Sequence, residues 1–79
     1  MQPKKLLEDI ARSLVDKPEG VVVTEVEKPD GSLTLELSVA DGDMGKIIGK
    51  GGRIARAIRQ IMKSASGVAK RKIFLEIKE

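Results

Sequence analysis

The amino-acid sequence predicts an α+β domain in which a three-stranded mixed sheet carries three helices on one face. Apolar residues recur at helical spacing in some segments and alternate in others, which gives the order helix, strand, strand, helix, helix, strand. Two helices between the last two strands form a crossover, so those strands can run parallel, while the first two pair as an antiparallel hairpin. One such layered unit, a single domain, accounts for residues 1–79.

The N-terminal half of the chain predicts a helix followed by a β-hairpin. Residues 3–15 form the helix, because Pro3 suits a first turn and the apolar residues after it recur at helical spacing. The helix ends before Pro18, since proline disfavours helical backbone in the residue that precedes it. Residues 21–27 and 33–39 are the strands, joined by a turn that contains Pro-Asp-Gly.

The two strands of this hairpin differ in how clearly they reveal a buried face. The second strand alternates strictly, and its expected buried set is Leu33, Leu35, Leu37 and Val39. For the first strand the inward residues are either Val22 and Val26 or Val21 and Val23. The hairpin therefore has one buried face, and the inward side of its first strand stays open at this point.

The C-terminal half predicts two helices. A short helix covers residues 44–48, with Asp41 and Asp43 as candidates for its N-cap. A longer helix covers residues 54–65, and Gly67 stands where its C-terminal cap is expected. The expected buried face of this helix consists of Ile54, Ala57, Ile58, Ile61, Met62 and Ala65.

The last strand, residues 72–77, alternates again, with Ile73, Leu75 and Ile77 as its expected buried set. Phe74, the only aromatic residue, falls on the opposite strand face. It closes an edge, serves an interface or packs into the core as part of the terminal strand, and the sequence does not choose among these. A chain of this size buries only about 60% of its unfolded surface, so its aliphatic core is thin.

Charge is unevenly distributed along the chain. Fifteen Lys and Arg against twelve Asp and Glu give a net charge of only +3. The segment from Lys46 to Lys72 nevertheless contains nine basic residues and no acidic one. Such a division indicates a surface that faces a polyanion, and the plainer alternative is a solvated basic face. Arg59 and Lys63 lie further from the glycine-rich segment at residues 46–53. For these two residues, a polyanion-binding surface and a solvated basic face are equally well supported.

Several classes of function are excluded by what the sequence lacks. It contains no cysteine, histidine or tyrosine, and its carboxylates avoid the glycine-rich segment. We therefore expect no enzyme, no metal site and no cofactor. The N-terminus does not resemble a signal peptide, and no apolar run approaches the roughly 20 residues of a membrane span. The expectation is a cytoplasmic protein without a membrane partner.

The most informative segment is the glycine-rich loop between the two C-terminal helices. Its residues 46–53 read Lys-Ile-Ile-Gly-Lys-Gly-Gly-Arg. The glycines allow a polyanion to approach the backbone closely, and the start of the following helix offers free N–H groups and a positive dipole end. A nucleotide-binding P-loop is excluded, because it needs four residues between its glycines, a following Lys-Ser or Lys-Thr, and a preceding strand.

This loop resembles the signature of the K-homology (KH) domain, because Ile47 and Ile48 precede a Gly49-x-x-Gly52 motif that lies between two helices. The order of elements resembles the type II, bacterial form of that fold over essentially the whole chain. The short length and the segments Asp43–Lys46 and Arg53–Arg59 resemble the KhpA family of small bacterial RNA-binding proteins. The resemblance implies that a GxxG loop clamps about four nucleotides of single-stranded RNA. It further implies a role in post-transcriptional regulation or RNA chaperoning.

The resemblance also assigns site residues and partners. Gly49 and Gly52 would shape the loop, Lys50 and the arginines would hold phosphates, and the isoleucines would form an apolar floor for bases, with the hairpin edge as the far wall. The implied partners are single-stranded RNA and either a second copy or a larger KH protein of the KhpB (Jag) type. An adaptor for protein association is the alternative, and single-stranded DNA is not distinguished from RNA. The candidate RNA-binding residues are Lys46, Ile47, Ile48, Gly49, Lys50, Gly51, Gly52, Arg53 and Arg56.

Overall fold

The computed structural model describes residues 2–78, and its elements follow the predicted order. The three helices are α1 (Pro3–Leu14), α2 (Met44–Ile48) and α3 (Arg53–Ala69), and the three strands are β1 (Val22–Glu27), β2 (Leu33–Ser38) and β3 (Ile73–Ile77). Short 3-10 turns at Pro18–Gly20 and Lys50–Gly52 precede β1 and α3. No helix in the described part of the chain is long and apolar enough to cross a membrane.

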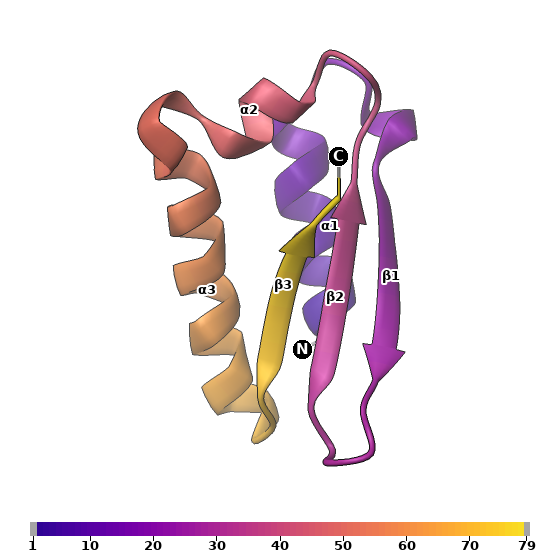
Figure 1. Cartoon of the computed structure of the whole chain (residues 1–79), viewed down its shortest axis with the longest axis vertical. Helices are drawn as coiled ribbons and strands as arrows, with labels where there is room; N and C mark the ends of the chain where they lie inside the picture. Colours follow the sequence, from indigo (N-terminus) through magenta and orange to yellow (C-terminus); the bar gives the residue numbers. More distant parts are fainter. Residues whose placement is uncertain (1, 79) are drawn as a thin grey trace.

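The sheet has the predicted mixed topology, with β2 in the centre. β1 pairs with β2 in antiparallel register, Val23 opposite Leu37. β2 pairs with β3 in parallel register, Leu35 opposite Leu75. α1 and α3 cover one face of the sheet, and α2 closes one end of this layer (Figure 1). The α+β fold class expected from the sequence is confirmed.

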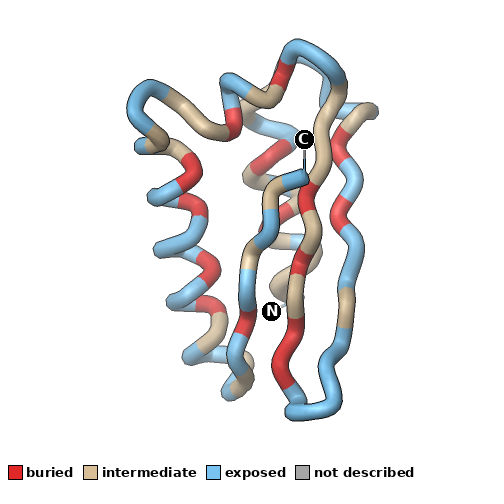
Figure 2. The backbone as a smooth tube through the Cα atoms, in the orientation of Figure 1, coloured by how far each residue is buried: buried red, intermediate tan, exposed pale blue. Residues whose placement is uncertain are grey.

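The core lies between this sheet face and the helices, where the buried segments of Figure 2 face one another. Leu33, Leu35 and Leu37 are buried as predicted. The inward-facing residues of the first strand are Val21 and Val23, because both are buried. The largest fully buried side chains are Leu7, Leu33, Leu35, Leu37, Ile47, Ile58 and Met62.

The opposite face of the sheet is exposed. Val22 is 54% exposed and Phe74 is 52% exposed, although the two residues belong to different edge strands. The reading in which Val22 points inward is therefore wrong. Phe74 does not pack into the core, since strand residues alternate between faces and its neighbour Ile73 is buried.

α3 continues beyond the end that its sequence suggests. Gly67 lies inside the helix, and the left-handed C-terminal position belongs to Lys70, with φ 58°. The N–H of Lys70 donates to the carbonyl of Ser66. The predicted cap at Gly67 is wrong because the buried Ala65 and the partly buried Ala69 continue the apolar stripe, which outweighs the roughly 1 kcal/mol that a mid-helix glycine costs.

The buried face of α3 is also rotated from the predicted one. Its buried residues are Ala55, Ile58, Met62 and Ala65. Ala57 is exposed and Ile61 is 42% exposed, so the prediction that both are buried is wrong. Adjacent helical positions differ by about 100° in direction, and a periodic pattern of aliphatic residues does not distinguish two stripes that lie one position apart.

Candidate nucleic-acid interface

Gly49 begins the loop between α2 and α3 and requires glycine for two independent reasons. Its φ of 76° with ψ of 172° lies outside the regions that residues with a side chain adopt readily. A Cβ atom at this position would stand 2.6 Å from Cγ1 of Ile54. The close contact holds the start of the loop against the first turn of α3, so Gly49 fixes the approach of the two helices.

Gly51 and Gly52 form the tip of the loop. Both are left-handed, with φ of 65° and 77°. A Cβ atom at either position would meet nothing within 4 Å. The backbone conformation therefore favours glycine here, while the space around the tip is open to an approaching ligand.

Two backbone N–H groups of this loop have no acceptor within residues 2–78. The N–H groups of Gly49, Gly52 and Arg53 donate to the carbonyls of Gly45, Gly49 and Lys50, respectively. Those of Lys50 and Gly51 make no hydrogen bond in the described part of the chain. Adjacent exposed N–H groups in a turn before a helix favour an anion, because they add to the positive end of the helix dipole.

Unpaired cations surround these donors. Lys50, Arg53 and Arg56 are exposed, and none of them forms an ion pair with another described residue. Arg53 and Arg56, with Ala57 and Gln60, line a hollow of about 330 Å³ beside the loop. The loop and the first two turns of α3 thus offer free positive charge to phosphate groups.

The residues of α2 have different positions from those expected. Ile47 is completely buried in the core, so it cannot form a floor for bases, and that assignment is wrong. Ile48 is half-buried. Lys46 is exposed, and its Nζ lies 3.1 Å from a carboxylate oxygen of Asp16. Because α2 is hardly more than one turn, Ile47 serves as its anchor in the core.

Asp43 has a role that the sequence does not reveal. It precedes α2, but its side chain makes no capping hydrogen bond. Its carboxylate instead accepts hydrogen bonds from the backbone N–H groups of Asp16 and Lys17, at 3.3 and 3.0 Å. Asp43 therefore ties the start of α2 to the segment after α1. No local sequence signal identifies this contact, because its partners lie 26 and 27 residues away.

The family resemblance predicts the edge of the hairpin as the far wall of the RNA site. In the structure, the strand beside α3 is β3. β1 lies at the opposite edge of the sheet (Figure 1). The Ser66 hydroxyl donates to the carbonyl of Arg71 and accepts from the N–H of Ile73, which places this flank of α3 against the start of β3. The hairpin edge as a wall of the site is therefore a wrong prediction.

Three basic residues of α3 lie on the side of the helix that also carries Ser66. Arg56, Arg59 and Lys63 precede Ser66 by ten, seven and three positions, a spacing that returns to the same side of a helix. We call these three residues the basic stripe. All three are exposed and free of ion pairs among the described side chains, so Arg59 and Lys63 extend the charge that begins at Arg53.

Comparison with solved structures finds the same fold in one part of a larger protein, Era, at low sequence identity. Era from Aquifex aeolicus bound to GDP and AlF4⁻ superposes with a TM-score of 0.64 at 17% identity. Era in complex with MgGDPNP and a segment of 16S ribosomal RNA superposes with a TM-score of 0.63, also at 17% identity. Each match covers 95% of this chain but under a third of Era, so the likeness shows the shared fold of one part of that protein.

Sequence comparison gives much closer relatives. The RNA-binding protein KhpA of Clostridium perfringens is 54% identical over 74 residues, which is 94% of this chain and 97% of that protein. The KhpA proteins of Clostridium acetobutylicum and Treponema pallidum are 53% and 43% identical over 94% of this chain, and the matches cover 97% and 91% of those proteins. The family model described as KhpA/KhpB, KH domain matches residues 4–77. This chain belongs to the KhpA/KhpB family of KH-domain proteins.

Proposed function

We propose that this chain binds single-stranded RNA and holds about four nucleotides at the loop Gly49–Gly52. The observation that carries the proposal is the pair of free N–H groups on Lys50 and Gly51, surrounded by unpaired cations. The names of the KhpA relatives support RNA as the ligand. In this proposal the chain binds RNA and does not catalyse a reaction.

Each part of the site has a physical task in this proposal. The two N–H groups bind one phosphate, and Lys50 adds a positive charge beside it. Arg53 and Arg56 bind the phosphates that follow. β3 has an unpaired edge beside the basic stripe, and its backbone N–H and C=O groups can form hydrogen bonds with bases. Such recognition needs no stacking on aromatic side chains, and the chain has only one of these.

A double substitution in the loop tests the proposal. Lys50→Asp with Gly51→Asp places two carboxylates at the proposed phosphate site. The fold should survive, because the Gly51 position is open and aspartate tolerates left-handed backbone better than most residues. We expect the affinity for an oligouridylate of about four nucleotides to fall below detection, measured by fluorescence anisotropy.

A matched control lies at the other end of the molecule. Lys28→Asp with Gly31→Asp makes the same change of charge, at a glycine that is also left-handed and open. This control should keep the affinity for the short oligonucleotide. If the loop variant is folded and still binds as tightly as the wild type, the loop is not the RNA site.

We further propose that RNA binding occurs in the cytoplasm, in post-transcriptional regulation or RNA chaperoning, and that a second KH domain supplies avidity. One site for four nucleotides binds weakly, and two linked sites gain affinity without new contacts. The second domain is another copy of this chain or a KhpB-type protein, and the family model that matches this chain describes both proteins. Analytical ultracentrifugation of the chain alone and mixed with such a protein tests this pairing.

A further inference from the structure

At the end of the molecule opposite to the glycine loop, the connection from α3 to β3 meets the hairpin turn between β1 and β2 (Figure 1). Basic residues gather at this end. A hollow of about 490 Å³ is lined by Asp30, Gly31, Ser32, Lys70, Arg71 and Lys72. We call it the far hollow. The RNA site proposed above does not include any of its residues.

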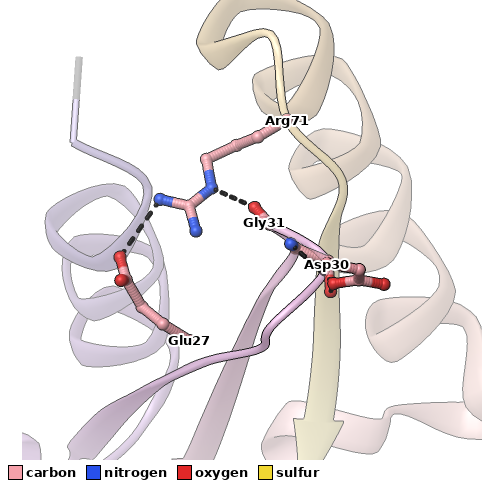
Figure 3. Close-up of polar contacts among 5 residues, drawn as sticks. Glu27, Asp30, Gly31 and Arg71 are labelled. Atoms are coloured by element: carbon pink, nitrogen blue, oxygen red, sulfur yellow. Dashed lines mark hydrogen bonds and ion pairs between the residues drawn. The ribbon is translucent and has the colours of Figure 1, made fainter.

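Arg71 holds the two walls of the far hollow together. Its Nε donates to the carbonyl of Gly31 at 3.1 Å, and its NH1 donates to Oε1 of Glu27 at 3.3 Å (Figure 3). The Ser66 hydroxyl fixes the same connection through Arg71 and Ile73. The walls are therefore tied in place without a ligand, and the charge of Arg71 is already compensated by Glu27.

The free charge of the far hollow comes from Lys70 and Lys72. Both are exposed, and neither forms an ion pair with a described residue. The one carboxylate in the lining, Asp30, accepts hydrogen bonds from the backbone N–H and hydroxyl of Ser32, at 2.9 and 2.7 Å. The lining carries three basic side chains against this single acidic one, so it is net positive even with Glu27 included.

Lys70 occupies a position that usually belongs to glycine. It is the only non-glycine residue with positive φ in the described chain, and the left-handed position after a helix costs a residue with a Cβ atom roughly 1 kcal/mol. Attraction to the C-terminal end of the helix dipole gives one reason for a cation at this position. That reason does not extend to Lys72, which lies beyond the helix and faces the same hollow.

The basic stripe connects the glycine loop with the far hollow. Arg56, Arg59 and Lys63 follow one flank of α3, and the segment between Lys46 and Lys72 contains no acidic residue that would interrupt the positive charge. α3 rises about 1.5 Å per residue, so the path from Arg53 to Lys70 spans about 25 Å. A strand that leaves the loop along this flank therefore passes Arg56, Arg59 and Lys63 before it reaches Lys70.

We propose that the far hollow is a second phosphate site for the same RNA strand, reached by strands longer than the four nucleotides held at the loop. The inference rests on the proposed function and extends it from a clamp to a track. Lys70 and Lys72 bind backbone phosphates there, so they add affinity without sequence preference.

The test compares two lengths of RNA on matched variants. The probes are an oligouridylate of about four nucleotides and one about three times as long. In the variant Lys70→Gly with Lys72→Ala, folding is not at risk, because glycine fits the left-handed position without strain. The control, Lys4→Ala with Lys17→Ala, removes the same charge from residues outside the proposed track.

We expect the far-hollow variant to bind the short RNA as the wild type does and the long RNA roughly tenfold more weakly. The salt dependence for the long RNA should fall by about 1.4 in log–log slope, since two phosphate contacts are lost at about 0.7 each. The control should retain both affinities. An unchanged affinity and slope for the long RNA, or an equal loss for both lengths, overturns the second site.

The failure of this inference is distinct from the failure of the proposed function. If the far-hollow variant binds the long RNA as tightly as the wild type does, while the Lys50→Asp/Gly51→Asp variant is still defective for the short RNA, only the second phosphate site is rejected. If that loop variant binds the short RNA normally, the clamp fails, and the long RNA still reports independently on Lys70 and Lys72.

Discussion

The Asp43 carboxylate accepts a hydrogen bond of 3.0 Å from the backbone N–H of Lys17, and this bond joins the start of α2 to the segment after α1. Asp43 is only 3% exposed, and the N–H of Asp16 donates to the same carboxylate. α2 has five residues and leads directly into Gly49. The position of the glycine loop therefore depends on a contact made at the other end of α2.

Replacement of Asp43 should weaken both the fold and RNA binding. Asp43→Ala leaves two N–H groups without their acceptor, which costs roughly 1–3 kcal/mol of unfolding free energy per group when the site stays buried. We expect reduced stability in urea and, under conditions where the variant is still folded, a several-fold lower affinity for RNA. Asp41→Ala is the control, because Asp41 is exposed and its side chain makes no hydrogen bond with a described residue. Equal stability of the two variants would contradict the role of Asp43.

The glycines of the loop should differ in their response to alanine. Gly49→Ala forces a Cβ atom to 2.6 Å from Ile54 in addition to the unfavourable φ, so we expect a loss clearly above 1 kcal/mol. Gly51→Ala meets no neighbouring atom and should cost about 1 kcal/mol from its left-handed backbone alone. Urea denaturation measures both values, and the reverse order would show that the contact between Gly49 and Ile54 is not tight in solution.

Two isoleucines of α3 provide a test of its rotation. Ile58 is fully buried, and Ile58→Ala should cost about 2–5 kcal/mol of unfolding free energy. Ile61 is exposed enough that Ile61→Ala should cost the isolated chain under about 1 kcal/mol. Similar losses for the two variants in a dilute, monomeric sample would mean that α3 buries the face first expected from the sequence.

Acid should remove a small stabilising contribution of Asp30. Hydrogen bonds from the side chain and backbone N–H of Ser32 hold the pKa of Asp30 below its usual value of 3.8. Since the carboxyl binds protons more weakly in the folded state, this stabilisation is present above pH 3.8 and disappears as the pH falls through the lower, folded pKa. The stability difference between wild type and Asp30→Asn should therefore shrink in acid. A difference that grows in acid would contradict this linkage.

The salt dependence of RNA binding counts the phosphates held by the site. About four contacts predict a slope near −3 in a plot of log affinity against log salt for a short single strand. Arg56→Ala should make this slope less steep by about 0.7. A slope close to zero in the wild type would mean that phosphates contribute little, which would favour the adaptor role.

The loop and the strands could be predicted from sequence because their signals are local. Strict alternation identifies the buried side of β2, and glycines spaced as Gly49 and Gly52 require a special backbone whatever surrounds them. The helix α2 has the predicted bounds, and α1 and the strands agree within one residue at either end.

The errors concern features that depend on tertiary packing. Ile47 was expected at the surface of the site, but a helix of one turn needs an apolar anchor in the core. A glycine such as Gly67 usually marks a helix end, yet α3 continues past it because Ala65 and Ala69 pack against the core. Asp43 had a local explanation as a cap, and its real partners become visible only when α1 and α2 are placed together.

The parallel pairing of β2 with β3 has a consequence for the order of folding. The hairpin of β1 and β2 closes over a short turn, whereas the pairing of Leu33 with Ile73 requires the whole α2–α3 crossover to be in place. Contacts between residues far apart in sequence carry the larger entropy of loop closure and therefore tend to form later and more slowly. The glycine loop lies in the middle of that crossover. During synthesis, the glycine loop thus leaves the ribosome before β3 does, and we expect it to reach its native geometry only after the last strand has docked.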